Sequence, residues 1–290
     1  MRVAVVGLGL IGGSMALDLR ASGFTSEVLG VDQNKGHTEE ALSLGIAHRI
    51  VSLEEACQTA DLIILSTPVN VLWDLLPKIL DSIGPETTII DVGSTKAKIG
   101  ETVKPHKKRS QFVSTHPMAG TEFSGPKAAH RGLFKSKATV ICDKEQSQQK
   151  HLERVVRMYE ELSMRVLYMN STEHDLHAAY VSHLSHISSF VLANTVLDKE
   201  KNVNAIFDLA SAGFESTVRL AKSSPDMWAP IFEQNNENIV EALGAYIEHL
   251  KIFHQKLQTH DYAGTKALMT RSNEIKRVLE KIHNKGKPNG

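Results

Sequence analysis

A glycine-rich stretch near the N-terminus constrains the fold of this chain more than any other feature. Residues 7–12 read Gly-Leu-Gly-Leu-Ile-Gly and directly follow the apolar run Arg2–Val6. A G-x-G-x-x-G spacing between a strand and a helix is typical of a loop that binds the pyrophosphate of a dinucleotide. Gly7 permits the tight turn, Gly9 lets the pyrophosphate approach the backbone, and Gly12 brings helix and strand close together.

The next predicted strand, Glu27–Asp32, ends in an acid twenty residues after the last glycine of the loop. At this distance a carboxylate accepts hydrogen bonds from the adenosine ribose hydroxyls. Asp32 would also repel a 2′-phosphate, so NAD is favoured over NADP, although Lys35 leaves the strictness of that preference open. The amides of Leu10 and Ile11, at the start of the following helix, are expected to bind the phosphates.

The first 170 residues alternate short apolar runs with helical patterns, which indicates βαβ units. The predicted strands are Arg2–Val6, Glu27–Asp32, Asp61–Ser66, Thr87–Asp91, Phe112–Thr115 and Ala138–Cys142. Helical periodicity is clear over Val69–Ser82 and Gln148–Leu162. Because the strands are apolar on both faces, we expect a parallel sheet covered by helices. The sequence therefore predicts an α/β Rossmann-type dinucleotide-binding domain over residues 1–170.

Residues 171–290 are predicted to form an all-α helical domain that takes part in substrate binding and dimerisation. The expected helices are Ser171–Asp198, Val203–Ala210, Pro225–Gln258 and Asp261–Asn284, and the tail 284–290 is expected to be disordered. One wide apolar stripe within the third helix consists of Trp228, Ile231, Phe232, Ile239, Leu243, Tyr246, Ile247, Leu250 and Phe253. Such helices need a partner surface, which favours a homodimer.

Composition limits the classes of function. The 290 residues suit two domains, and 33 Lys+Arg against 33 Asp+Glu leave no basic excess for nucleic acid. No window approaches the ~18 apolar residues of a membrane span. The N-terminal apolar run is too short for a signal peptide, and Cys57 and Cys142 lie far apart in the sequence. We therefore expect reduced thiols and a cytoplasmic protein that acts on a small molecule, without membrane or nucleic-acid partners.

Three polar loops follow predicted strands and should meet at the carboxyl edge of the sheet. They are Ser66–Pro68, Asp91–Lys96 and His116–Glu122. His116 is a candidate general base, because an imidazole titrates near neutrality, and Ser94 could orient its ring. The cofactor-binding residues predicted in the first two loops are Ser66, Thr67, Pro68 and Gly93.

Several segments together resemble the prephenate/arogenate dehydrogenase family of tyrosine biosynthesis. They are GLGLIGGS at residues 7–14, DVGSTK at 91–96, HPMAGTEFSG at 116–125, SHLSH at 182–186 and FESTVRLAKSSPDMW at 214–228. The glycine loop is shared by many dehydrogenases, whereas the third and fifth segments are far more specific. The resemblance implies a dinucleotide domain joined to an all-helical dimerisation domain, and NAD-dependent oxidative decarboxylation of prephenate to 4-hydroxyphenylpyruvate.

The resemblance also implies roles for individual residues. His116 matches the histidine that accepts the proton of the ring hydroxyl, and Ser94 matches the serine beside it. His186 and Arg219 match residues that bind substrate carboxylates, and a guanidinium suits that task. The other positions that match the substrate site are Thr121, Glu122, His174 and Ser182.

Small departures from the family pattern bear on the substrate. Ser185 stands where proline is frequent, and Thr95 stands where valine is frequent. Ser216 occupies a position where an acidic side chain is associated with arogenate, whose amine it can pair. Serine there favours prephenate, with arogenate or dual cyclohexadienyl activity as the alternative. Any feedback inhibition by tyrosine is expected to act at the active site itself.

The histidines of the second domain suggest a metal site, but helical spacing argues against one. His174 and His183 are nine residues apart, which places them on opposite sides of a regular α-helix. No metal is expected, and His177 and His183 are interpreted as packing or capping residues. Two other functions stay open: a different two-domain dehydrogenase, which lacks a loop like His116–Glu122, and a non-catalytic NAD-binding sensor.

Overall fold

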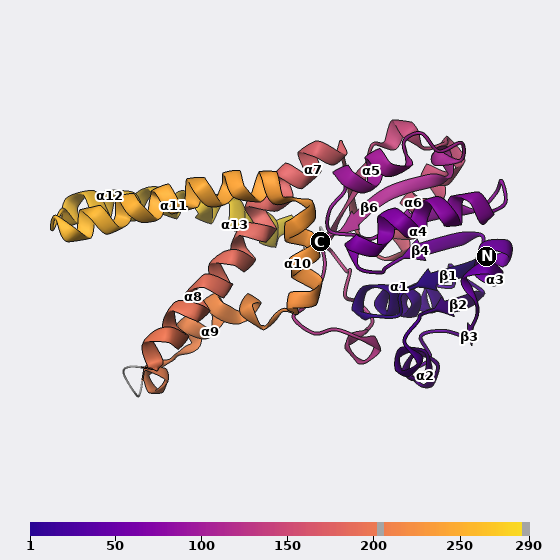
Figure 1. The fold of residues 1–290 in the computed structure, drawn as a ribbon, viewed down its shortest axis with the longest axis horizontal. Helices are drawn as coiled ribbons and strands as arrows, with labels where there is room; N and C mark the ends of the chain where they lie inside the picture. Colours follow the sequence, from indigo (N-terminus) through magenta and orange to yellow (C-terminus); the bar gives the residue numbers. More distant parts are fainter. Residues whose placement is uncertain (202–205, 286–290) are drawn as a thin grey trace. The chain divides into compact units, whose positions relative to one another are not determined.

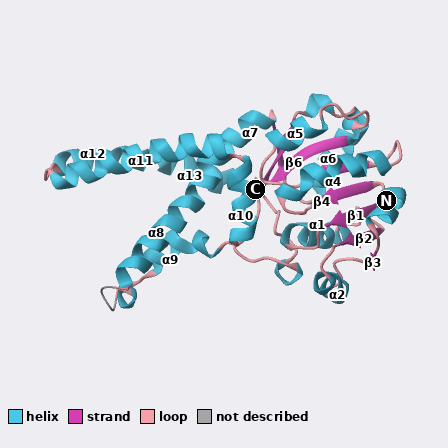
Figure 2. Cartoon of the chain, in the orientation of Figure 1, coloured by secondary structure: helices cyan, strands magenta, loops and turns pink. Residues whose placement is uncertain are grey.

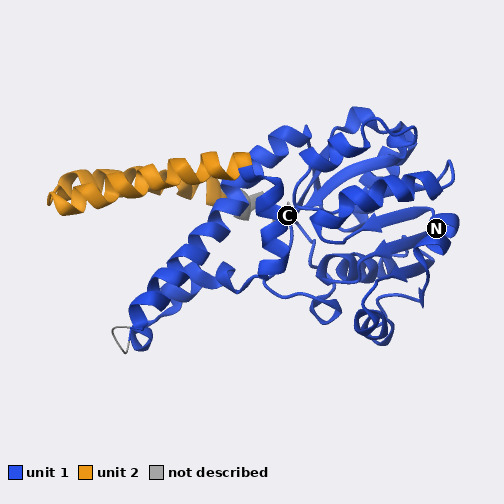
Figure 3. Ribbon diagram, in the orientation of Figure 1, with its two compact units in different colours: residues 1–236 blue, residues 237–290 orange. Residues whose placement is uncertain are grey.

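The computed structural model describes residues 1–201 and 206–285. The chain forms two compact units, Met1–Asn236 and Glu237–Gly290 (Figure 3). The first contains a β-sheet with helices around it, and the described part of the second is helical (Figure 2). Both units lack, over the described ranges, any helix long and apolar enough to cross a membrane.

Within the described residues of the first unit, eight strands form one sheet in the order β3-β2-β1-β4-β5-β6-β7-β8 (Figure 1). The strands are β1 (Arg2–Val6), β2 (Glu27–Val31), β3 (Arg49–Ile50), β4 (Leu62–Leu65), β5 (Thr88–Asp91), β6 (Phe112–Pro117), β7 (Ala138–Cys142) and β8 (Arg165–Met169). Every predicted strand is present, with small shifts at the ends. The α/β fold predicted for the first half is therefore confirmed.

The prediction of a parallel sheet is wrong at one edge. Strands β1 to β6 run parallel, but β7 pairs antiparallel with β6, and β8 pairs parallel with β7. A parallel connection needs a crossover of a dozen or more residues, usually with a helix. Residues 118–137, between β6 and β7, form only the 3-10 turn Pro126–Ala128, so the chain returns alongside β6 in the opposite direction.

Two strands were not predicted. Strand β3 has two residues, which is too short for an apolar pattern. Strand β8 lies at the edge of the sheet, and Arg165 and Tyr168 on it are exposed. An edge strand need not be apolar on both faces, so the pattern used for the other strands does not detect it.

Helices cover both faces of the sheet. They include α1 (Leu10–Ala21), α2 (Lys35–Ser43), α3 (Leu53–Thr59), α4 (Val69–Ser82), α5 (Ala97–Val103) and α6 (Gln149–Glu161). Side chains alternate along a strand, so Val3 and Val5 of β1 join one buried cluster with Met15 of α1. Ala4 of β1 joins the other cluster with Leu76 of α4. The carboxyl ends of the strands are thus held between two packed layers.

In the described chain, the first unit continues into four further helices. They are α7 (Ser171–Ala178), α8 (Leu184–Glu200), α9 (Ala212–Val218) and α10 (Pro225–Gln234). The predicted helix Ser171–Asp198 is present, but Ala179–His183 within it is π-helical. Trp228 and Ile231 of α10 join the buried cluster that includes α4. Of the predicted helix Val203–Ala210, residues 203–205 lie outside the described part, and Phe207–Leu209 form a 3-10 turn.

The predicted helix Pro225–Gln258 is interrupted at Asn235. This residue is buried, with φ −107° and ψ 27°, and its side-chain amide donates to the carbonyl oxygen of Asp175 over 2.7 Å. A buried side-chain amide needs a hydrogen-bond partner, and the backbone of Asn235 adopts the conformation that lets its amide reach this one. The sequence pattern, which follows only the apolar positions, does not contain this constraint.

The described part of the second unit contains α11 (Asn236–Gln258), apart from its first residue, followed by α12 (Tyr262–Ser272), the 3-10 turn Asn273–Ile275 and α13 (Lys276–Lys285). The predicted helix Asp261–Asn284 is therefore confirmed apart from that turn. Apolar side chains of the stripe on α11 are exposed within the chain: Ile247 by 41%, Leu250 by 51% and Phe253 by 37%. The tail expected to be disordered lies, from residue 286 onward, outside the described residues.

Gly12→Ala is expected to destabilise the protein. A Cβ at Gly12 would collide with Ser66 Oγ and the Gly7 carbonyl oxygen and lie 2.8 Å from Val5 Cγ1. Overpacking of this kind costs about 1–3 kcal/mol. Each kcal/mol lowers the midpoint of thermal unfolding by about 2–4 °C in a protein of this size. Gly9→Ala is the matched control, because no atom lies within 4 Å of its added Cβ. Equal midpoints for the two variants would contradict this account of the loop.

The free energy of unfolding is expected to fall between pH 7 and pH 5, in part through His151. Burial lowers the pKa of His151 to about 4, and its Nδ1 lies 2.7 Å from Thr88 Oγ1. The unfolded chain takes up this proton near pH 6.5, so stability is fully present above that pH and is lost toward pH 4. His151→Gln should remove about 1–2 kcal/mol of the loss, measured by urea unfolding at both pH values. The same pH dependence in both proteins would rule out this contribution.

Candidate active site

The glycine loop forms one side of the candidate site. Strand β1 ends at Val6 and α1 begins at Leu10. Gly7 has φ +96°, and a Cβ there would lie 2.6 Å from the carbonyl oxygen of Ser66. By contrast, a Cβ at Gly9 would point into open space. The loop therefore leaves room over the N-terminus of α1, where backbone amides are available to a phosphate.

Asp32 lies directly beside this loop, one residue past the end of β2. Its Oδ2 accepts from the Leu8 amide over 2.9 Å, and its Oδ1 accepts from the Asn34 amide over 2.9 Å. The positively chargeable group near it is His37, with Nδ1 3.5 Å from Oδ2, whereas Lys35 is exposed. The loop and the acid thus occupy the relative positions that a dinucleotide requires.

The loops after β4 and β5 complete this side. Ser66 Oγ donates to the Gly7 carbonyl oxygen over 2.6 Å, so this hydroxyl supports the glycine loop itself. Thr67 Oγ1 is buried without a hydrogen-bond partner among the described residues. Gly93 donates its amide to Asp91 Oδ2, and Pro68 is exposed at the start of α4. A buried orphan hydroxyl is a position at which a ligand could supply the missing partner.

His116 lies in β6, near its carboxyl end, and is 9% exposed. Its Nδ1 lies 2.8 Å from Nε2 of His174, which is 2% exposed. Burial lowers the pKa of His116 well below its usual value near 6.5, and His174, Lys96 and His183 contribute smaller effects in the same direction. His116 is therefore neutral at pH 7 and able to accept a proton.

A buried ion pair fixes the strand ends beneath His116. Lys96 donates through Nζ to Asp91 Oδ2 and, over 2.7 Å, to the carbonyl oxygen of Thr115. Lys96 and Asp91 are both fully buried. Lys96 was not predicted as a site residue, although a lysine five residues after an acid at a strand end is visible in the sequence. The pair joins the loop that carries Ser94 to the strand that carries His116.

Hydrogen bonds through Asp175 and Asn235 join the histidines of the helical part. His174 Nδ1 lies 2.8 Å from Asp175 Oδ1, and Asn235 Nδ2 contacts both the Asp175 carbonyl oxygen and His183 Nδ1. His174 also affects the pKa of His183, which burial lowers to about 4. The prediction that His174 and His183 lie on opposite helix faces assumed a regular α-helix, whereas the turn Ala179–His183 between them is π-helical and changes the phase of the helix.

The remaining histidines behave differently from one another. His183 is buried against the rings of Trp228 and Phe232, as expected for a packing residue. His177 is exposed in the last turn of α7, which makes it neither buried packing nor part of the histidine network. No group of three or more histidine, cysteine or acidic side chains suited to a metal occurs among the described residues. Cys57 and Cys142 are both buried and are not joined in a disulfide.

A second group of predicted residues lies around Arg219. Arg219 Nη1 is 3.3 Å from Glu122 Oε2, and the positive charge of Arg219 contributes to lowering the pKa of His186, after burial. His186 Nδ1 donates to the Ser182 carbonyl oxygen over 3.0 Å, which leaves its Nε2 available. Thr121 is half-buried beside Glu122. Glu122, Arg219, His186 and Ser182 are thus brought together.

Trp228 links the two groups and was missed as a site residue. Its ring stacks on His186 with centroids 3.6 Å apart and lies 5.8 Å from the ring of His183. Its Nε1 is buried without a hydrogen-bond partner in the described chain. In the sequence, Trp228 lies in an apolar stripe and at the end of the segment FESTVRLAKSSPDMW, and neither placement reveals that its ring stacks on His186.

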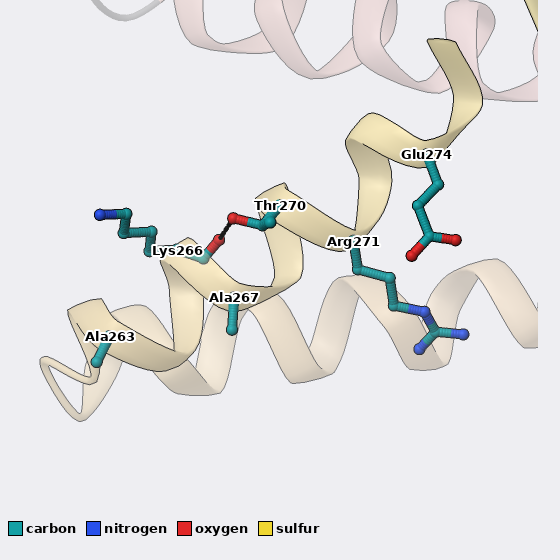
Figure 4. A pocket seen from close by; sticks show the side chains of 6 residues that line it. All are labelled: Ala263, Lys266, Ala267, Thr270, Arg271 and Glu274. Carbon is teal, nitrogen blue, oxygen red and sulfur yellow. Dashed lines mark hydrogen bonds between the residues drawn. The ribbon is translucent and has the colours of Figure 1, made fainter. Parts of the chain in front are cut away.

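Of the other positions singled out in the sequence, Ser185 and Ser216 are exposed, whereas Thr95 is buried. Ser216 is exposed on α9, and its hydroxyl donates to the Gly213 carbonyl oxygen. Thr95 donates to Gln234 Oε1 over 2.7 Å, and Ser185 is exposed. A surface hollow of about 510 Å³ on the second unit contains none of the predicted site residues; Ala263, Lys266, Ala267, Thr270, Arg271 and Glu274 line it (Figure 4).

Comparison with known proteins identifies the family. A family model described as prephenate dehydrogenase, nucleotide-binding domain, matches residues 15–168, and one described as prephenate dehydrogenase, dimerization domain, matches residues 170–271. The prephenate dehydrogenase of Lactococcus lactis subsp. cremoris is 29% identical, over 99% of this chain and 80% of the relative. That of Bacillus subtilis is 30% identical, over 86% of this chain and 68% of the relative.

A solved structure agrees with these relatives. The crystal structure of prephenate dehydrogenase from A. aeolicus in complex with hydroxyphenyl propionate and NAD+ has a TM-score of 0.87 and 30% sequence identity. The match covers 96% of this chain and 98% of that one. Because the two family models together span most of the chain, the chain belongs to the prephenate dehydrogenase family.

Proposed function

We infer that this chain oxidises prephenate with NAD, with loss of carbon dioxide, to give 4-hydroxyphenylpyruvate. The observation that carries this inference is a neutral, buried His116 at the same strand edge as the dinucleotide loop. The relatives named above are prephenate dehydrogenases. The arogenate alternative is not favoured by those names, and exposed Ser216 offers no carboxylate to an amine.

The residues of the loop fit NAD as cofactor. Gly9 leaves open space where the pyrophosphate would lie, and the amides of Leu10 and Ile11 stand at the N-terminus of α1. Asp32 is positioned for the adenosine ribose, and the orphan hydroxyl of Thr67 would gain a partner. When bound, NAD supplies the acceptor for the hydride.

His116 holds the proton that the reaction releases. Hydride leaves the ring carbon that bears the hydroxyl, the hydroxyl proton moves to His116 Nε2, and the ring carboxylate departs as carbon dioxide. Aromatisation of the ring drives the step, so the residues need only bind, orient and accept a proton. Ser94, in the loop fixed by Lys96, is assigned to orient the hydroxyl beside His116.

The substrate carboxylates are assigned to the group around Arg219. Arg219 is half-exposed and pairs with Glu122 over 3.3 Å, so a substrate carboxylate can replace or share this partner. His186 keeps Nε2 free for a second contact, and its ring is fixed by stacking on Trp228. Thr121, Ser182 and His174 complete the predicted set, although His174 is 2% exposed and acts behind His116.

The assembly follows from the second half of the chain. We propose domains 1–170 and 171–290 and a homodimer formed through the helical one. The matching family model is described as a dimerization domain, and Ile247, Leu250 and Phe253 expose apolar surface on α11. The cytoplasmic location expected from two reduced cysteines stays a prediction.

The test of this function is the appearance of reduced nicotinamide, followed by absorbance, with prephenate or arogenate crossed with NAD or NADP. Turnover is expected with prephenate and NAD, because Asp32 disfavours a 2′-phosphate and Ser216 lacks a charge for an amine. Turnover of arogenate alone would contradict the assignment of substrate. No turnover in any combination would contradict the proposed function.

His116→Asn and Arg219→Ala are expected to fail in different ways. Asparagine keeps a donor toward His174 but removes the accepting Nε2, so kcat should fall by roughly 10²–10⁴-fold with little change in KM for prephenate. Removal of the Arg219 guanidinium should mainly raise KM, because a carboxylate contact is lost. Steady-state kinetics of the two purified variants separates the roles. The reverse pattern would show that the assignments are exchanged.

A further inference from the structure

Behind His116 lies a chain of buried groups that the reaction, as derived above, does not use. Asp175 Oδ1 accepts from the Lys96 amide and lies 2.8 Å from His174 Nδ1, and Oδ2 accepts from the Ala97 amide over 2.9 Å. His174 Nε2 in turn lies 2.8 Å from His116 Nδ1. Asp175 and His174 are each 2% exposed, so water does not compete for these contacts.

The direction of each hydrogen bond follows from the chemistry of the groups. An ionised carboxylate only accepts, so His174 Nδ1 must donate to Asp175. A neutral imidazole that donates through one nitrogen accepts through the other, so His174 Nε2 accepts from His116 Nδ1. His116 then carries its proton on Nδ1, and its Nε2 has a free lone pair. Nε2 is the nitrogen left for the substrate.

We propose that Asp175 and His174 are positioning residues that hold His116 in the tautomer with an accepting Nε2. The proposal rests on the proposed function, in which that nitrogen receives the proton of the ring hydroxyl. Neither residue touches substrate in this assignment, and His174, grouped with the substrate-binding residues on the basis of resemblance, is reassigned. Asp175 thus sets the tautomer of His116 through His174, as a carboxylate orients a histidine in other carboxylate–histidine systems.

The Asp175 carboxylate also connects helix α7 to the start of helix α5. The Lys96 and Ala97 amides belong to the start of α5, so Asp175 ties α7 to the loop that carries Ser94. Asn235 donates to the carbonyl oxygen of Asp175 and thereby holds the backbone of α7 from the other side. Orientation of His116 and placement of the loop therefore depend on one side chain.

Asp175→Asn tests the proposal through kinetics. An amide in place of the carboxylate presents a donor either to His174 or to a backbone amide, so the fixed sequence of donors and acceptors is lost. We expect kcat to fall by roughly 10²-fold or more, with KM for prephenate and for NAD nearly unchanged. The loss should be equal from pH 6 to pH 8, because a tautomer ratio does not depend on pH.

The pH profile of kcat distinguishes loss of the fixed tautomer from loss of the negative charge of Asp175. The titratable groups that act on His116 are His174, Lys96 and His183, and Asp91 and Asp175 are paired with Lys96 and His174 respectively. If Asp175 acted only through its charge, the variant would shift the acid limb of kcat and keep the plateau. That outcome would overturn the proposal.

Asp143→Asn is the matched control. Asp143 is also a buried carboxylate at a helix start, where it accepts from the Ser171 amide over 3.0 Å and from the Ser171 hydroxyl. It has no hydrogen bond to a histidine among the described contacts. Because asparagine can both accept from the amide and donate to the hydroxyl, kcat should stay within about twofold of the wild type. A loss equal to that of Asp175→Asn would mean that any buried carboxylate near α7 matters, which contradicts a tautomer role.

Nuclear magnetic resonance of ¹⁵N-labelled histidine tests the tautomer without turnover. Ring nitrogens that carry a proton differ in shift from those that do not, and the His116 signals are identified by their loss in His116→Asn. The resting enzyme should have a protonated Nδ1 and a bare Nε2 at His116, and Asp175→Asn should change this pattern while Asp143→Asn should not. A protonated Nε2 in the wild type would refute the proposal even if prephenate is turned over. The predicted pattern without any turnover would instead contradict the function alone.

Discussion

The candidate site depends on the buried ion pair between Lys96 and Asp91. The two side chains are fully buried, and Lys96 also donates to the carbonyl oxygen of Thr115, so one ammonium joins the ends of β5 and β6. Loss of one partner of a buried pair costs about 3–5 kcal/mol, because the other charge is left without compensation. Ser94 follows the end of β5, and His116 lies in β6 directly after Thr115. Their separation is therefore fixed by an interaction that neither of them makes.

The helical half of the chain completes this edge of the sheet. Asp175 binds the start of α5, and Trp228 joins the buried cluster that contains residues of α4. For this reason the first compact unit extends to Asn236, whereas the family models change between residues 168 and 170. The boundary between the two family models and the boundary between the two compact units therefore lie at different residues. His116, the proposed proton acceptor, belongs to the sheet, and His174 and Asp175, which are proposed to orient it, belong to helix α7.

The sequence predicted the parts of the site that rest on local rules. The glycine loop and Asp32 follow from fixed spacing within one βαβ unit, and His116 follows from the position of its strand end. Asp175 and Trp228 could not be found in this way, because their roles arise from contacts between segments far apart in the chain. Lys96 was missed although its partner Asp91 lies only five residues before it.

The errors in the predicted fold have similar causes. The direction of β7 depends on the absence of a helix in residues 118–137, which apolar periodicity within β7 does not report. The opposite placement of His174 and His183 assumed a regular α-helix, and the π-helical turn Ala179–His183 removes that assumption. Asn235 breaks a helix through a hydrogen bond to Asp175, sixty residues away in the sequence.

Burial of His116 has an apparent cost for a base, since a lowered pKa means a weaker attraction for a proton. The reaction does not require a strong base. As hydride leaves the ring carbon, the hydroxyl becomes that of a protonated ketone, which is a strong acid and gives up its proton to a weak acceptor. What the step requires is an acceptor that is neutral at working pH and correctly oriented. Burial keeps His116 neutral, and the hydrogen bond to His174 fixes the orientation of its ring. The site thus has a weaker base, which is sufficient for this proton, held in the orientation that the transfer requires.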